Sequence, residues 1–237
     1  MVDSLAFKLE ALITIVDSHL GDDLQDLFRE NNMPISLLTY GYGSAKSVVY
    51  DILGYGSSKK IISISLQTKD MSNYIVEQLH DKIDFSKPGT GVACTISISS
   101  ASRVLSTTLQ QAEKNLKIGS EDMAATSKEP YHLIITIVNS GYFEQVMEAA
   151  KAAGATGGTL VHARGLGSKE AIKYLGITIQ PEKDLVLILA PQKNKLAIME
   201  NITREVGLNT AGKGICFSLP VNKALGLEAS IDNFDEL

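Results

Sequence analysis

The sequence predicts a chain of the α+β class, made of two tandem modules in which the elements follow the order β-α-β-β-α-β and the sheets are antiparallel. Three observations lead to this prediction. Short segments recur in the same order, both halves show the same succession of apolar runs and helical patterns, and a polar stretch separates the halves. We expect the first module over residues 6–105, a linker over 106–130 and the second module over 131–237.

Self-similarity is the most informative of these observations. Each repeated segment lies at a nearly constant distance from its counterpart. One such match could arise by chance, whereas three in the same order indicate a tandem repeat. The pairs are residues 13–18 (ITIVDS) and 135–140 (ITIVNS), 41–44 (GYGS) and 165–168 (GLGS), and 89–91 (GTG) and 212–214 (GKG).

The two halves predict the same elements. β-Branched runs predict strands, and apolar residues spaced three or four apart predict helices with one apolar face. Asp17 and Asn139 follow the first strand of each half, and we expect their side chains to cap the next helix. The predicted strands are 12–16, 35–40, 61–66 and 92–98 in the first half and 133–138, 159–163, 185–189 and 215–221 in the second, and the helices are 24–28, 72–82, 143–150 and 195–206. This order is the ferredoxin-like pattern, with both helices on one face of a four-stranded sheet.

The third strands of the two halves differ. Residues 185–189 (LVLIL) are apolar on both faces, so we expect the helix-free face to pack against another sheet and the chain to self-associate. Residues 62–66 (ISISL) and 96–99 (ISIS) alternate apolar residues with small hydroxyls. We expect these hydroxyls on the helix-free face of the first module.

Composition and charge exclude several classes of protein. With 44% hydrophobic and 21% charged residues, the chain has enough apolar side chains for a packed core. The formal charge of −5 argues against broad capture of nucleic acid and against an anionic membrane surface. No apolar run approaches the about 20 residues that span a bilayer, and residues 1–12 lack the pattern of a signal peptide. We therefore expect a cytoplasmic protein with no nucleic-acid partner and no membrane insertion.

The sequence shows no catalytic or metal-binding constellation. None of the four histidines is spaced for metal binding with another histidine or a cysteine. No nucleophile elbow occurs, and His132 and His162 fall in predicted strands, where a structural role is expected. Cys94 and Cys216 lie in apolar runs and are interpreted as buried thiols of a reducing compartment, without a disulfide. We expect neither an enzyme nor a metalloprotein.

The Gly-x-Gly elements of both halves have two interpretations. They are either tight turns or places where backbone N–H groups approach an anion, because glycine has no Cβ. The residues alone leave both interpretations open.

The second half resembles the PII nitrogen-regulatory signalling proteins. Residues 153–161 (AGATGGTLV), followed by 164–167 (RGLG), are similar to the stretch that enters the family's long effector loop. Residues 215–221 (ICFSLPV) are similar to its closing strand, which follows a glycine-rich loop. The resemblance covers residues 131 to about 227, and the first half shares mainly the topology and the glycines.

This resemblance implies modules that associate as trimers, with ATP/ADP-type effectors in the clefts between them. It also implies a regulator of nitrogen metabolism that contacts protein targets, with no cofactor beyond the effector. Thr159 is implied to lie near the nucleotide base, and the glycines are implied to shape the cleft. The residues implicated in effector binding are Thr159, Gly165, Gly167, Lys169, Gly212, Lys213 and Gly214.

The chain also departs from the family pattern. Residues 168–170 (SKE) replace Arg-Gln-Lys, Ile215 replaces a phosphate-binding lysine, and two late arginines are missing. Lys169 and Lys213 are left as cations for a polyphosphate. Three hypotheses follow: a PII-like regulator that binds an effector and a protein partner, an effector-free assembly module, and an enzyme on the same scaffold.

Overall fold

The computed structural model describes residues 8–44, 59–87, 89–116, 130–165, 172–174, 177–179 and 182–227. Contacts divide the chain into two compact units, the first comprising residues 1–40, 60–128 and 221–237 and the second 41–59 and 129–220. The chain therefore passes into the second unit within strand β2 (Ser36–Gly43) and back into the first at residue 60. It enters the second unit again at residue 129 and returns to the first after strand β10 (Ile215–Pro220). The expected modules, 6–105 and 131–237, were defined by the sequence repeat, whereas these two units are defined by contacts between residues.

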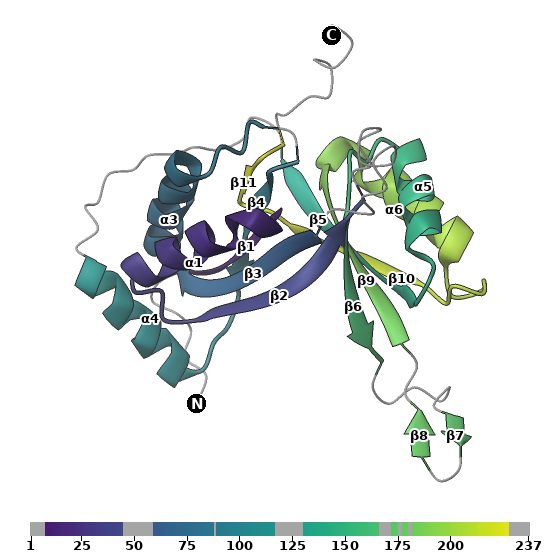
Figure 1. Cartoon of the computed structure of the whole chain (residues 1–237), viewed down its shortest axis with the longest axis horizontal. Coiled ribbons are helices and arrows are strands. Elements are labelled where there is room, and N and C mark those ends of the chain that lie inside the picture. Colours follow the sequence, from purple (N-terminus) through teal and green to yellow (C-terminus); the bar gives the residue numbers. More distant parts are fainter. Residues whose placement is uncertain are drawn as a thin grey trace, which may run out of the picture. The chain divides into compact units, whose positions relative to one another are not determined.

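The first unit has an antiparallel sheet with helices on one face, as Figure 1 shows for α1 and α3. Its strands have the order β2-β3-β1-β4-β11, and β1 is antiparallel to both β3 and β4. In chain order the elements are β1 (Leu9–Asp17), the 3-10 turn η1 (Ser18–Leu20), α1 (Gly21–Glu30), β2, β3 (Lys59–Thr68), α3 (Lys69–Lys82), β4 (Gly91–Ile98), α4 (Arg103–Leu116) and β11 (Lys223–Leu225).

The second unit repeats this arrangement with α5 and α6 on one face (Figure 1). The strand order is β10-β5-β9-β6, and the last residues of β2 pair with β6. Its elements are β5 (Tyr131–Asn139), α5 (Phe143–Ala152), β6 (Thr159–Arg164), β7 (Ile172–Tyr174), β8 (Ile177–Ile179), β9 (Glu182–Pro191), α6 (Gln192–Val206) and β10. The predicted α+β class, with ferredoxin-like modules and antiparallel sheets, is confirmed, and the short hairpin of β7 and β8 was not predicted.

Apolar helix faces form the core of each unit, as the spacing predicted. In the first unit α1 buries Leu24, Leu27 and Phe28, and α4, which extends into the expected linker, buries Leu109 completely. In the second unit α5 and α6 meet the face of the sheet that carries Ile134. Helices this short are stabilised mainly by such packing.

The prediction that the side chains of Asp17 and Asn139 cap the next helix is confirmed in the first half, for the 3-10 turn η1, and is wrong in the second. The Asp17 side chain accepts from the backbone N–H of His19 at 3.3 Å and so caps η1 instead of α1. Asn139 leaves α5 uncapped, because its Nδ2 donates to the carbonyl of Ala211 at 2.9 Å. The side chain that could have capped the helix instead holds the loop before β10.

The small hydroxyls of the first unit lie on the face opposite to the one predicted. Strand pairing sets Leu12 opposite Ser65 and Thr95, and Thr14 opposite Ser63. Leu12 belongs to the core under the helices, so the hydroxyls lie there too. All four are fully buried, and their oxygens have no hydrogen-bond partner among the described residues. Alternation fixes which residues share a face of a strand, but it does not fix which face the helices cover.

The corresponding layer of the second unit is apolar. Val186 and Ile188 pair with Thr136 and Ile134, so they take the places of Ser63 and Ser65. Leu187, on the other face of β9, is only 9% exposed. The predicted apolar character of both faces of β9 is therefore confirmed.

Both cysteines are free thiols within strands; Cys94 is buried, as predicted, whereas Cys216 is only partly buried. Burial raises the pKa of the Cys94 thiol on β4 to about 12. Burial also raises the pKa of Cys216 on β10, although a hydrogen bond from Thr136 acts in the opposite direction. Neither thiol is expected to be a nucleophile at neutral pH.

Candidate functional site

Most of the predicted site residues that the structure describes lie at the same end of the second unit's sheet, with Gly165 after β6 and the loop 207–214 before β10, on the other side of β5 and β9. At this end β5 and β6 finish and β9 and β10 begin. Gly165 directly follows β6, and the loop 207–214 leads into β10. The cross-strand pairs here are Asn139 with Lys183 and Arg164 with Glu182.

The loop 207–214 is a tight turn that uses its own backbone donors. The N–H of Gly212 donates to Thr210 Oγ1 at 3.2 Å, and that of Lys213 to the Thr210 carbonyl at 3.3 Å. The N–H of Gly214 donates to the Val206 carbonyl at 2.7 Å. In this conformation all three donors that the sequence offered to an anion are bonded within the loop.

The loop glycines also allow close packing. A Cβ at Gly212 would approach Tyr142 Cδ1 to 3.3 Å and Val206 Cβ to 3.1 Å. A Cβ at Gly214 would collide with the Val206 carbonyl and lie 2.9 Å from Val138 Cγ1. A larger residue at either position would therefore displace the loop from the sheet, whatever its effect on a ligand.

Lys213 has an unusual backbone conformation. Its φ is 49°, in the left-handed region, which costs a residue with a side chain about 1–2 kcal/mol. The side chain is exposed, with Nζ donating to the Leu208 carbonyl at 3.2 Å. Backbone strain of this kind is found preferentially at functional sites, and here it fixes a cation at the tip of the loop.

Two residues that the sequence analysis did not single out as site residues hold this loop in place. Lys183 Nζ donates to Asn139 Oδ1 at 2.6 Å. The N–H of Asn139 donates to the Gly212 carbonyl at 2.8 Å, and its Nδ2 to that of Ala211 at 2.9 Å. The repeat did mark Asn139, but a cap was the simpler interpretation, and the contact with Lys183 joins residues far apart in sequence.

The first unit has the corresponding lysine contact, between Lys60 and Asp17, with the carboxylate of Asp17 in the place of the Asn139 amide. Lys60 Nζ donates to the Gly89 carbonyl at 2.6 Å and lies 3.4 Å from Asp17 Oδ2. The N–H of Asp17 donates to the Thr90 carbonyl at 2.8 Å. Partial burial opposes ionisation of Asp17, but hydrogen bonds from His19 and the charge of Lys60 outweigh it and lower the pKa of Asp17.

Thr159 lies apart from the glycine loop. It begins β6, whereas Gly165 follows the end of that six-residue strand, about 3.3 Å further for each residue. Thr159 is buried and pairs with Gly43, the end of the first Gly-x-Gly. Next to it the N–H of Gly158 donates to Ser44 Oγ at 2.7 Å. The structure thus separates Thr159 from the other described site residues of its unit, and Gly167 and Lys169 lie outside the described residues.

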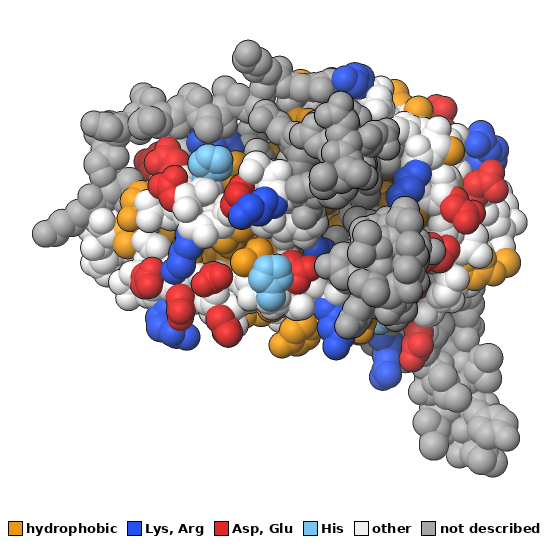
Figure 2. All heavy atoms as spheres, turned by 45° about the horizontal axis from the view of Figure 1, so that its top comes forward, with side chains coloured by type: hydrophobic (Ala, Val, Ile, Leu, Met, Phe, Trp, Pro, Cys, Tyr) orange, Lys and Arg blue, Asp and Glu red, His pale blue; other side chains and the backbone are white. Residues whose placement is uncertain are grey.

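The described surface carries no dominant charge on the face shown in Figure 2, where acidic and basic side chains are interspersed. Within the described ranges, no three His, Cys, Asp or Glu residues gather as metal ligands. In the same part of the chain no helix has the length and apolar character needed to cross a membrane.

Comparison with known proteins yields one family match. The model of the family described as "Nitrogen regulatory protein P-II" matches residues 131–229. A search of curated proteins finds no match.

Solved structures similar to this chain include PII of Arabidopsis thaliana bound to citrate, with 21% identity over 40% of this chain and 79% of that one and a TM-score of 0.31. GlnK of B. subtilis has 14% identity over 40% of this chain and 95% of that one, with a TM-score of 0.31. The B. subtilis GlnK-ATP complex has 14% identity over 41% and 96%, also with a TM-score of 0.31.

Proposed function

We propose, from the premise that the second module of this chain belongs to the P-II family, that the protein is a PII-like regulator in nitrogen metabolism. In this proposal it binds a small effector of the adenine-nucleotide type and controls a partner protein by contact. We also propose that it acts in the cytoplasm and catalyses no reaction. The family match supports this function, because residues 131–229 include the loop before β10 and both roots of the β7–β8 hairpin.

The effector site is proposed at the sheet end where Gly165 and the loop 207–214 lie. The observation that carries this placement is Lys213, an exposed cation held at a φ of 49°. A hydrogen bond from a charged donor to an anionic ligand contributes about 1.5–3 kcal/mol, enough to compensate for the strain. Gly167 and Lys169 follow Gly165 in the sequence and are proposed as further ligands.

The regulatory output is proposed to be the hairpin of β7 and β8. This hairpin connects β6 to β9, and the ends of these two strands flank the proposed site. A ligand that contacts both ends would favour one arrangement of the hairpin over others, and this difference would reach a partner protein.

Thr159 is proposed to contact an effector that is bound by the glycine loop of another chain. Thr159 begins β6, whereas Gly165 follows the last residue of that strand and the loop 207–214 precedes β10, so a single nucleotide is poorly placed to contact Thr159 and the loop within one unit. We propose that modules of different chains supply the two halves of a complete cleft, which requires a homo-oligomer. Light scattering that shows a strict monomer at all concentrations would contradict this part.

Calorimetry of the full chain against ATP, ADP, AMP and citrate tests the function. Saturable binding of a nucleotide, with no change of the ligand after prolonged incubation, is the expected result. Turnover of the ligand would favour the enzyme hypothesis instead.

The effector-free assembly module is the second candidate. The backbone N–H groups of Gly212, Lys213 and Gly214 are all bonded within the loop, which favours this alternative. If the chain forms a stable oligomer and none of the ligands binds, the assembly module replaces the regulator as the better description.

A further inference from the structure

A buried carboxylate lies at the start of β9. Asp184 is 1% exposed. Its Oδ2 accepts from the N–H of Gly141 at 2.9 Å, and its Oδ1 lies 3.3 Å from Ser140 Oγ and 3.1 Å from His162 Nδ1. The first two donors are neutral, so the imidazole is the group among these contacts that can balance the carboxylate's charge.

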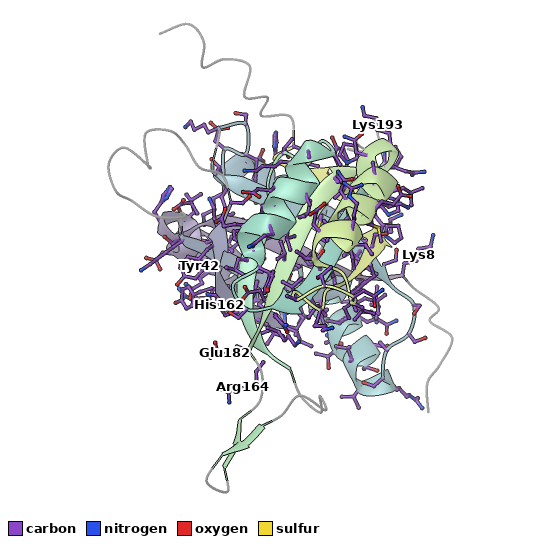
Figure 3. The ribbon with its side chains drawn as sticks, turned by 90° about the vertical axis from the view of Figure 1, so that its right-hand side faces the viewer. Lys8, Tyr42, His162, Arg164, Glu182 and Lys193 are labelled. Atoms are coloured by element: carbon purple, nitrogen blue, oxygen red, sulfur yellow. The ribbon has the colours of Figure 1, made fainter. Side chains whose placement is uncertain are left out.

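The imidazole of His162 is held at one nitrogen and open at the other. A carboxylate accepts hydrogen bonds, so the contact with Asp184 assigns the proton to Nδ1 and leaves a lone pair on Nε2. The His162 side chain is 62% exposed. The centroid of the Tyr42 ring lies 5.7 Å from that of the imidazole, and the two rings are tilted by 58°. Figure 3 shows Tyr42 beside His162.

A cation lies on the same side of the strand. Arg164 is two residues beyond His162 on β6 and therefore on the same face of the sheet. It is exposed and pairs across the strands with Glu182, and Figure 3 shows both at this end of β6 and β9. A guanidinium can bind two oxygens of a phosphoryl group at once.

We propose that His162 is a phosphoryl-acceptor site, modified at Nε2 by donors that carry phosphate on nitrogen, such as phosphoramidate. The Nε2 lone pair forms a bond to phosphorus, and the donor's P–N bond breaks. The leaving nitrogen takes a proton from the donor or from water and departs as an amine, which is ammonia in the case of phosphoramidate. The ring becomes a phosphorylated imidazolium that keeps its Nδ1–H, and the buried carboxylate of Asp184 stabilises that positive charge. Arg164 holds the phosphoryl oxygens. This site does not depend on effector binding.

Two of the other three histidines, His19 and His132, provide internal controls. His19 Nδ1 also contacts a carboxylate, Asp17, at 2.8 Å. That carboxylate has a side chain 22% exposed, and Lys60 lies 3.4 Å from it. Its charge is therefore shared and hydrated, and it should stabilise a modified ring less. Burial and the charge of Lys195 lower the pKa of His132. His132 therefore differs from His19 and His162, whose Nδ1 atoms contact a carboxylate.

The test is treatment of the full chain with phosphoramidate, followed by peptide mapping and ³¹P NMR. The expected result is one phosphoryl group on His162 Nε2, formed about tenfold faster than on His19, as the contribution of a charge-assisted contact predicts. H162Q should abolish this modification and H19Q should leave it unchanged; both side chains are exposed, so both variants should fold. Equal rates at His19 and His162, or attachment at Nδ1, would overturn the proposal.

Asp184 acts as a positioning residue, so its test needs a readout of the ring itself. The ¹⁵N NMR spectrum of wild-type His162 should show the Nδ1–H tautomer, and the Nε2–H tautomer would contradict the proposal. D184N retains an oxygen acceptor but loses the charge, and should slow phosphorylation about tenfold. If D184N fails to fold, R164Q tests the phosphoryl site instead. This variant should slow the reaction of His162 with phosphoramidate but leave its reaction with uncharged diethyl pyrocarbonate unchanged. An equal effect of R164Q on both reagents, or none on either, would contradict the role of Arg164 and the phosphoryl specificity.

Discussion

The loops before the last strand of each unit have the same Gly-x-Gly pattern but use it differently. In the first unit the left-handed conformation falls on the glycines, with φ of 82° at Gly89 and 145° at Gly91. In the second unit it falls on Lys213, with φ of 49°, while Gly212 and Gly214 allow close packing. The first loop is relaxed, and the second accepts strain to hold a cation. This difference is the reason why we propose the effector site in the second unit.

The sheets of the two units differ in a second respect. Under its helices the first unit buries the hydroxyls of Ser63 and Ser65 without partners, where the second unit has Val186 and Ile188. An unpaired buried hydroxyl lowers stability. The second unit therefore combines an apolar pair of residues in this core layer with a strained loop, whereas the first unit combines unpaired buried hydroxyls with a loop whose positive φ angles fall on glycines.

The largest expected effect is at Gly91. A Cβ there collides with the Ile15 carbonyl and comes within 2.8 Å of Val16 Cα, at a φ of 145°. Collision and strain together should lower the free energy of unfolding by about 3 kcal/mol in G91A. Chemical denaturation measures this.

Its control is G89A in the same loop. Gly89 also has a positive φ, but nothing lies within 4 Å of a Cβ there. Strain alone should cost about 1 kcal/mol. If the two variants were equally stable, packing against β1 would not be the reason for Gly91.

The next effect concerns Lys213. K213N removes the charge but keeps a residue that tolerates the left-handed region, so the fold should persist. Affinity for an anionic effector should fall by about 1.5–3 kcal/mol, measured by calorimetry. K87N, in the corresponding loop of the first unit, should bind as wild type, and an equal loss in both variants would remove the proposed asymmetry.

The buried hydroxyl layer gives a smaller effect of opposite sign. T14V replaces an unpaired hydroxyl with a methyl of similar shape, and should raise the free energy of unfolding by about 1 kcal/mol. T136V is the matched change in the second unit, where Oγ1 donates to Cys216 Sγ at 3.4 Å, and should be slightly destabilising. Destabilisation by T14V would show that its hydroxyl is satisfied after all.

The smallest expected effect is the contribution of the Asp17–Lys60 contact to the pH dependence of the unfolding free energy. The folded-state pKa of Asp17 lies below 3.8, so its stabilising contribution is complete above the unfolded-state value and is lost as the pH falls through the folded-state value. The pair with Lys60 is partly exposed and should contribute less than about 1 kcal/mol. D17N, which copies Asn139 of the second unit, should flatten this part of the profile of unfolding free energy against pH. An unchanged acid limb would contradict the role of Asp17.

The sequence was sufficient for the fold because the relevant signals are local. Strand runs and helical spacing identified the four main strands and two helices of each repeat, although not the hairpin of β7 and β8. The pairing of the strands within each unit then follows from the ferredoxin-like order of the elements. The prediction of the sheet face that carries the hydroxyls was wrong. Ser63 and Ser65 alternate with isoleucines, and alternation alone does not show which face of the sheet the helices cover.

The site was less predictable because its contacts are not local. Glycine spacing found Gly212 and Gly214, but no pattern indicates that their N–H groups bond to Thr210 and Val206. The contacts of Lys183 with Asn139 and of Asp184 with His162 join separate strands. Such pairs become visible only when the strand register is known.

Hydrogen exchange of the full chain, with and without ATP, tests the placement of the effector site most directly. Backbone amides of the loop 207–214 and of residues 139–141 should gain protection when ATP binds, because a ligand at this end of the sheet suppresses opening of the loop. Residues 84–91 of the first unit should exchange at an unchanged rate. Protection confined to 84–91, or ATP binding without any change in 207–214, would contradict an effector site in the second unit.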